Sequence, residues 1–255
     1  MKSRIYAIFF LFSFFSSLAL KAQRPPTPSL NYASLSRNDW ASIMRGGQAL
    51  PTKKQTEFEL RGSPFIEDKY QKGVIILSDT VKSPDDFTFM VKINAEDNEI
   101  WIMGDKNQEL ALIDKRITGV DVIAPNDTQY FRKVFLPDLK EKSFRFVEIL
   151  YGGVNFSLVK HTSKKFEPAN AVDKGVGIVG RNYDSYETAT SYYVFTSKKV
   201  YKKIALKRGE LYRVNPELVE KNKDAINAFC KKNQISNPLE ESDAIELMEF
   251  LDSLK

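Results

Sequence analysis

Residues 144–160 read FRFVEILYGGVNFSLVK, and this stretch decides the fold. Two runs rich in apolar and β-branched residues stand on either side of Tyr151-Gly152-Gly153, which is typical of strands joined by a tight turn. The sequence therefore predicts an antiparallel hairpin with strands over 144–150 and 154–160.

Similar short runs stand before and after this hairpin, separated by polar turns. The turn Ala95-Glu96-Asp97-Asn98 has hairpin chemistry of its own. We expect further strands over 73–77, 87–94, 99–103, 110–113, 119–123, 130–136, 191–196 and 199–205. Together they predict a β-rich domain over 61–206, built as an antiparallel meander or a partly open barrel.

One segment inside this domain, 162–187, shows no periodicity and contains Lys, Pro, Asn, Gly and Asp. We expect a long loop insertion there. Residues 23–60 are rich in proline and serine, which predicts an N-terminal arm or linker.

The last fifty residues have helical patterning. Asn215 followed by Pro216 is typical of a helix start, and Ser242 is a candidate cap of a later helix. Apolar residues then recur at helical spacing, which predicts two to three helices over 207–255, packed on the sheet. The expected fold class is α+β.

Residues 1–22 have the layout of a secretory signal peptide. A basic head with Lys2 and Arg4 precedes a sixteen-residue apolar run over 5–20, and Ala22 is a small residue at the expected cleavage point. The run is shorter than the roughly 20 residues that a membrane-spanning helix needs, although an uncleaved anchor is the alternative. We expect an exported protein, periplasmic, associated with the outer membrane or released, without a transmembrane span after cleavage.

Composition narrows the classes of partner. Of the 38 Lys and Arg residues, Lys2, Arg4 and Lys21 lie in the leader, which leaves 35 against 33 Asp and Glu. This near balance argues against a nucleic-acid partner. Cys230 is the only cysteine, so no internal disulfide can form. The oligomeric state is left open.

Several short patches follow one another in a recognisable order. They are Arg61-Gly62-Ser63-Pro64-Phe65 with 66–70 behind it, Lys72-Gly73, Asp97-Asn98-Glu99, the 147–153 turn leading to 158–160, the Lys-rich 228–233 and the terminal 247–254. This order resembles a family of exported proteins of Bacteroidetes-type Gram-negative bacteria whose function is uncharacterised. The resemblance implies an envelope location and a β-rich body with Lys-rich C-terminal helices. It implies no reaction.

Candidate catalytic and metal-binding residues are few. His161 would have to be the base of any Ser–His or Cys–His pair, but no nucleophile motif stands near it, and Cys230 lies on an apolar helix stripe. One His and one Cys cannot make a zinc site of the usual kind. Acidic turns at 85–86 and 96–99 lack the spacing of a calcium loop, and 175–180 (GVGIVG) lacks the dinucleotide pattern. We therefore expect no catalytic residue, metal or cofactor.

The stretch 181–193 (RNYDSYETATSYY) is the best candidate for recognition. Tyrosines on a loop supply amphipathic contact area with little loss of entropy on binding. The candidate residues are Arg181, Tyr183, Tyr186, Tyr192 and Tyr193. The alternative is that the tyrosines only pack against the body.

Asp79-Thr80-Val81 is similar to the short O-glycosylation acceptor sequence of those bacteria, which makes Thr80 a candidate modification site.

These features predict a non-enzymatic envelope protein that acts through contacts with an envelope or outer-membrane protein, or with a ligand. Two alternatives stay open at this point. One is a periplasmic carrier of a small lipid or glycan in a β-lined cavity, and the other is a hydrolase with unrecognised carboxylates.

Overall fold

The computed structural model describes residues 48–49, 58–77, 81–82, 88–104, 107–112, 117–124, 127–136, 138–139, 143–173, 178–196 and 201–254. The candidate sites at Ala22 and Thr80, the acidic pair at 85–86 and the first half of the 175–180 glycine stretch lie outside these residues. The arm or linker predicted over 23–60 is described only at 48–49 and 58–60.

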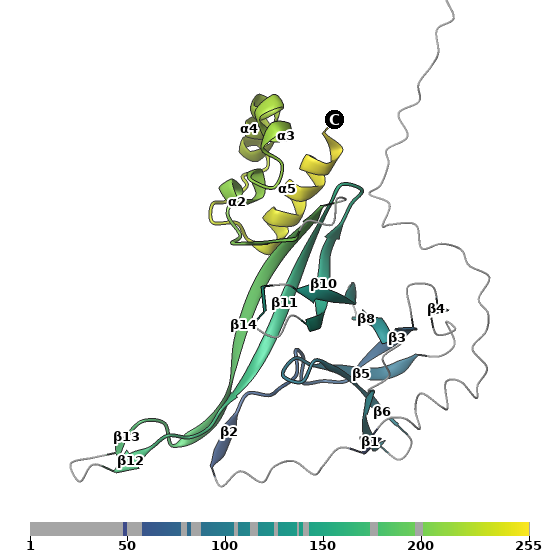
Figure 1. Ribbon diagram of the computed structural model, residues 1–255, viewed down its shortest axis with the longest axis vertical. Coiled ribbons are helices and arrows are strands. Elements are labelled where there is room, and N and C mark those ends of the chain that lie inside the picture. The colour runs from purple at the N-terminus through teal and green to yellow at the C-terminus, as the bar shows by residue number, and fades with distance from the viewer. Residues whose placement is uncertain are drawn as a thin grey trace, which may run out of the picture.

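One large open sheet organises the described chain, as expected for the α+β class (Figure 1). Its main path runs β1-β7-β6-β5-β3-β8-β9-β10-β11-β14-β15, with β4 beside β3 and β2 beside β14. All neighbours on the path are antiparallel, and β2 pairs with β14 in parallel. The strands are β1 (Gln48–Ala49), β2 (Glu59–Arg61), β3 (Gln71–Leu77), β4 (Val81–Lys82), β5 (Phe89–Asn94), β6 (Glu99–Met103), β7 (Glu109–Leu112), β8 (Ile117–Ile123), β9 (Thr128–Leu136), β10 (Ser143–Gly152), β11 (Phe156–Glu167), β14 (Tyr183–Thr196) and β15 (Tyr201–Ile204).

The strand order departs from a simple meander at β3. This strand lies between β5 and β8, so β5, β6 and β7 form a side branch of hairpins before the chain returns to the other edge of β3. The turn between β5 and β6 forms where expected. Its Asn98 has a φ of 60°, and the Asn98 side chain accepts a hydrogen bond from the amide of Phe146 at 2.7 Å.

The hairpin predicted over 144–160 is present as β10 and β11. Glu148 lies opposite Lys160, and the register shifts between Ile149 and Tyr151. Three clusters of buried side chains share this sheet. One is formed by strands β3 to β10 around Ile100, and a second lies between β11, β14, β15 and the helices around Leu158. The third and smallest consists of Leu136, Val147, Val159 and Tyr193.

Four helices of the described chain cover one end of the sheet: α2 (Arg208–Tyr212), α3 (Pro216–Lys221), α4 (Lys223–Lys232) and α5 (Glu241–Ser253). The predicted start of α3 is correct, because the Asn215 side chain accepts from the amide of Leu218 at 3.2 Å. Ser242 is not the cap of α5, since Glu240 occupies that position. None of these helices is long and apolar enough to cross a membrane.

The prediction of a loop over 162–187 is wrong for most of its length. β11 continues to Glu167 and β14 begins at Tyr183, so these two strands form one long hairpin (Figure 1). Between them, β12 (Val172–Asp173) pairs with β13 (Ile178–Val179). The loop prediction relied on a missing apolar period, but a ribbon with two solvent-facing sides does not need one.

Candidate functional site

The outer part of the β11–β14 hairpin projects from the body, opposite the helices (Figure 1). We call residues 162–191 together with β2 the arm. Twelve residues of β11 pair with β14 in unbroken register, from Phe156 opposite Thr196 to Glu167 opposite Ser185. The pairing of β11 with β10 ends at Lys160 of β11. Beyond this point the ribbon consists of β11, β14 and the short β2. The arm is therefore a thin extension of the sheet.

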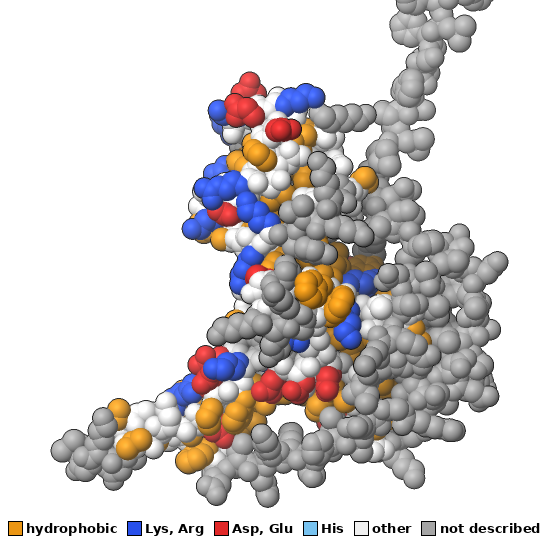
Figure 2. Space-filling view, viewed as in Figure 1, with side chains coloured by type: hydrophobic (Ala, Val, Ile, Leu, Met, Phe, Trp, Pro, Cys, Tyr) orange, Lys and Arg blue, Asp and Glu red, His pale blue; other side chains and the backbone are white. Residues whose placement is uncertain are grey.

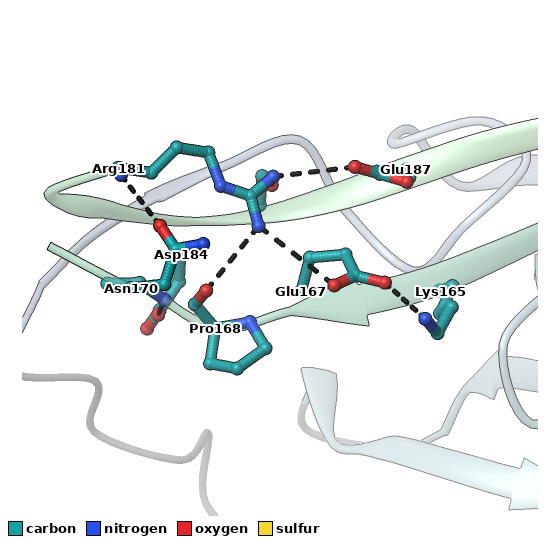
Figure 3. Close-up of polar contacts among 9 residues, drawn as sticks. Lys165, Glu167, Pro168, Asn170, Arg181, Asp184 and Glu187 are labelled. Atoms are coloured by element: carbon teal, nitrogen blue, oxygen red, sulfur yellow. Dashed lines mark hydrogen bonds and ion pairs between the residues drawn. The ribbon is translucent and has the colours of Figure 1, made fainter. Parts of the chain in front are cut away.

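Side chains alternate across the arm, which gives it two different faces. One face is charged and is organised by Arg181 (Figure 3). The Arg181 guanidinium donates to Ser185 Oγ at 3.0 Å and to Glu187 Oε1 at 3.4 Å, and it lies 4.0 Å from Glu167 Oε2. Its backbone amide donates to Asn170 Oδ1 at 2.7 Å. One arginine thus links β14, the end of β11 and the turn after it.

Further charges on this face also pair with one another. Lys165 pairs with Glu167, and the hydrogen bond between them raises the pKa of Lys165 and lowers that of Glu167. On β2, Arg61 pairs with Glu59 at 3.3 Å, and its guanidinium lies 3.8 Å from the centroid of the Tyr183 ring. Exposed pairs of this kind add little stability one by one, so their main effect is to hold the side chains of the arm in place.

The opposite face of the arm holds its aromatic side chains, among polar residues such as Lys164 and Thr188. The rings of Phe166 and Tyr186 meet edge to face at 5.5 Å between centroids. Tyr186 lies beside the β5–β6 turn, where burial first, and then the charge of Glu96, raises the pKa of its phenol to about 12. Leu60 of β2 extends this face outward and is exposed.

The distal end of the arm gathers exposed apolar side chains. Eight large hydrophobic residues are exposed within the described chain, and four of them belong to the arm or its entry: Phe58, Leu60, Val172 and Val179. Figure 2 shows hydrophobic side chains along the projecting part of the molecule. Asp184 is buried at the base of this end and accepts from the amide of Ala169 at 2.7 Å. The tip is therefore held by polar contacts while its apolar side chains face outward.

The recognition residues expected from the sequence separate into two groups. Arg181, Tyr183 and Tyr186 lie on the arm. Tyr183 and Tyr186 are on strand β14 instead of the predicted loop, and Arg181 stands two residues before this strand. Tyr192 and Tyr193 lie in the body and point to opposite faces of the sheet. Tyr192 donates to Glu241 of α5 at 2.6 Å, and Tyr193, only 1% exposed, donates to Asp138 at 3.0 Å. These two tyrosines hold the fold together and are not part of the arm.

The two candidate nucleophile or base residues are buried. His161 is 7% exposed on β11, and burial, with a further effect of Arg145, lowers its pKa to about 4. Cys230 is a free buried thiol on α4, 3.6 Å from the hydroxyl of Tyr212. The acidic turn at 96–99 uses Asn94 Oδ1 to accept from the amides of Glu96 and Asp97, which is turn chemistry.

Two polar clusters join residues that are far apart in sequence. Lys160 bridges Glu148 at 3.7 Å and Glu241 at 2.9 Å, where the sheet meets α5. Burial is the first cause of the raised pKa of Glu148. Lys92 lies between the rings of Phe65 and Tyr70, at 4.1 and 4.2 Å from their centroids, and bonds Glu109 at 3.2 Å. No local motif could have shown either cluster.

Among the described residues, a shallow hollow near the second cluster encloses only about 20 Å³, and another of about 10 Å³ lies between Phe156 of β11 and the helices. Ligand pockets are usually about 300–1,000 Å³ and more enclosed. Among the described residues, no group of three or more His, Cys, Asp or Glu side chains is placed to hold a metal ion. The arm is therefore the best-defined candidate surface.

Comparisons with known proteins add no assignment: no family model, no curated protein and no solved structure matches this chain.

Proposed function

We propose that this is an exported, non-enzymatic protein of the bacterial envelope that works by holding a partner protein on its arm. The observation that carries the proposal is the arm itself. It projects from the sheet, and four of the eight large hydrophobic residues that are exposed in the described chain lie on it or at its entry, three on the arm and Phe58 just before β2. Exposed apolar side chains gathered in one place favour a protein contact, because a lone monomer gains nothing by leaving them in water.

The charged face supports a binding role over a catalytic one. Arg181, Lys165 and Glu167 are engaged with one another and with the backbone, so they serve the geometry of the arm. A binding element gains from such stiffening, since less conformational entropy is lost when the partner docks.

Export is supported by the sequence alone. The basic head, the apolar run over 5–20 and the small residue Ala22 have the order of a cleavable leader. The mass of the protein isolated from a cell-envelope fraction tests this directly. We expect the mass of a chain that begins at Gln23, and the mass of the full chain in the cytoplasm would contradict it.

The contact role is tested by site-specific photocrosslinking in native cells. A photoreactive amino acid replaces Val179 at the tip in one variant and Val154, an 85% exposed valine at the β10–β11 turn, in the other. We expect one discrete crosslinked species from Val179 and none from Val154. Equal crosslinking at both positions, or none at either, would contradict the proposal.

A further inference from the structure

The outer edge of β14 has a gap between two paired stretches. β2 pairs with residues 183–185 of β14, and β15 pairs with residues 192–195. Gly62, just after β2, lies against the backbone of Tyr186, and over 187–191 the described chain places a strand only on the β11 side. Residues 187–190 are exposed, so this stretch of the edge faces solvent.

Backbone directions follow from two hydrogen bonds. The Lys164 amide donates to the carbonyl of Ala95 at 3.5 Å, so it points away from β14. Thr188 lies directly opposite Lys164, and opposed residues of an antiparallel pair share this direction. The backbone N–H and C=O groups of Thr188 therefore point away from β11. The carbonyl of Ala189 accepts from the Ser163 hydroxyl at 3.3 Å, on the β11 side. Because backbone directions alternate along a strand, Thr190 points outward like Thr188. The N–H and C=O groups of both threonines therefore face the open edge.

Within the part of the chain that the structure describes, this edge lacks the features that usually block strand addition. Proteins protect free edges with lysine, proline, bulges or covering segments. Residues 188–191 read Thr-Ala-Thr-Ser, without charge or proline, and the register with β11 has no bulge. Threonine is also favoured in strands. The other edge of the arm differs, because the β5–β6 turn already bonds Lys164 there.

We propose that the open edge of β14 binds a short extended segment of another protein, which adds to the sheet as one more strand. The inference rests on the proposed function, because it states how the arm would hold its partner. In this mode, main-chain hydrogen bonds supply the affinity and side chains on alternate positions supply the selectivity.

The length of the gap decides between a foreign segment and a second copy of this chain. The five residues 187–191 span about 17 Å at roughly 3.3 Å per residue. A second copy would bring its own β2 and β15 on the same edge of its own β14, and these strands would collide with the first arm at both ends of the gap. A separate segment of about five residues fits between β2 and β15 of one chain.

The segment can be described further from its neighbours. Glu187, which also accepts from Arg181 at 3.4 Å, is the charged side chain at the edge. Its side chain is 63% exposed, while the following residues are small or β-branched. Opposite charges stabilise neighbouring positions on adjacent strands. We therefore expect an uncharged, β-branched segment with one Lys or Arg beside Glu187.

A displayed library of random seven-residue peptides, selected on the purified full chain, provides the probe. The test compares Thr190→Pro, which removes an outward N–H and inserts a ring at the edge, with Thr190→Val, which keeps the N–H and the branched shape. We expect the selected peptides to bind the wild type and Thr190→Val alike, and to bind Thr190→Pro at least about tenfold more weakly. Peptides that bind both variants equally, or a selection that yields no peptide, would overturn the inference.

Hydrogen exchange on the wild-type protein gives a second readout that does not depend on how Thr190→Pro folds. The amides of Thr188 and Thr190 should exchange quickly in the free protein, and their exchange should slow at least about tenfold with saturating peptide. If the peptide protects other amides but not these two, strand addition is refuted. In cells, a crosslink from Val179 that persists in the Thr190→Pro variant would contradict strand addition, while the proposed contact role of the arm would stand. The absence of any crosslink from position 179 when Thr190 is unchanged would contradict both the contact role and strand addition.

Discussion

The two halves of the β11–β14 hairpin have the same pairing and opposite surroundings. In the inner half, Leu158 and Val194 are fully buried beneath the helices. In the outer half, the ribbon has solvent on much of both faces and ion pairs in place of a core. The register nevertheless runs through both halves without a shift. Burial fixes the register at one end, and continuous pairing carries it to the other.

This contrast explains how a thin ribbon can stay ordered. An isolated two-stranded hairpin is marginal in water, since it lacks a face to bury. Here the first pairs form inside a core, so each further pair outward extends an existing ladder. The arm is therefore an extension of a stable sheet, with a stability that should fall with distance from the helices.

The largest expected effect tests the inner half. Replacing Leu158 with alanine removes a fully buried side chain and should cost about 3 kcal/mol of unfolding free energy, measured by guanidinium denaturation. Phe166→Ala, on the partly exposed arm, is the matched change and should cost about 1 kcal/mol or less. Equal losses would show that the arm belongs to the core, and the contrast would fail.

An intermediate effect is expected at the junction, where His161 follows the last residue paired with β10. Burial lowers the pKa of His161 to about 4, so between roughly pH 6.5 and 4 the unfolded state binds a proton that the folded state does not. Stability should fall as the pH drops through this range, by on the order of 2 kcal/mol. Unfolding of the wild type and of His161→Gln at pH 7 and pH 4 isolates the effect, because the variant lacks this titration. The same pH dependence in both proteins would rule it out.

The smallest effect on global stability belongs to the outer half. Arg181→Gln removes the guanidinium contacts with Ser185 and Glu187, yet it should change the unfolding free energy by less than about 1 kcal/mol, because the pairs are partly exposed. Amide exchange over the arm should accelerate several-fold while the amides of β8 and β9 keep their rates. Arg213→Gln, which breaks the 2.5 Å pair with Glu210 on the helical side, is the control and should leave the arm unchanged. Unchanged exchange in Arg181→Gln would show that the arm does not depend on this cluster.

The parts of the fold that were predictable from the sequence have local causes. The β10–β11 hairpin follows from apolar runs around Gly152-Gly153, and α3 follows from Asn215 and Pro216. The strands of the arm were missed because residues 162–167 do not alternate between apolar and polar, and solvent on both sides removes the reason to alternate. The parallel partner β2 has three exposed residues, so it carried no strand signal.

The candidate surface was only partly predictable for the same reason. Arg181, Tyr183 and Tyr186 could be grouped because they are close in sequence, but their neighbours Glu167 and Arg61 reach them through strand pairing. Tyr192 and Tyr193 were grouped with them by proximity in the chain. Alternation along one strand then sends these two side chains into two different packed layers.

The position of β3 between β5 and β8 has a consequence for the rate of folding. The β5–β6 and β6–β7 hairpins pair residues that are close in sequence, so they can form in microseconds. The pairing of β3 with β8, with Lys72 opposite Ile123, joins residues that are far apart in sequence and is expected to form later. Closing such a large loop costs conformational entropy before the contacts between the two strands can stabilise it. Until β8 arrives, one side of β3 stays unpaired, so the centre of this sheet is assembled late and its hairpins early.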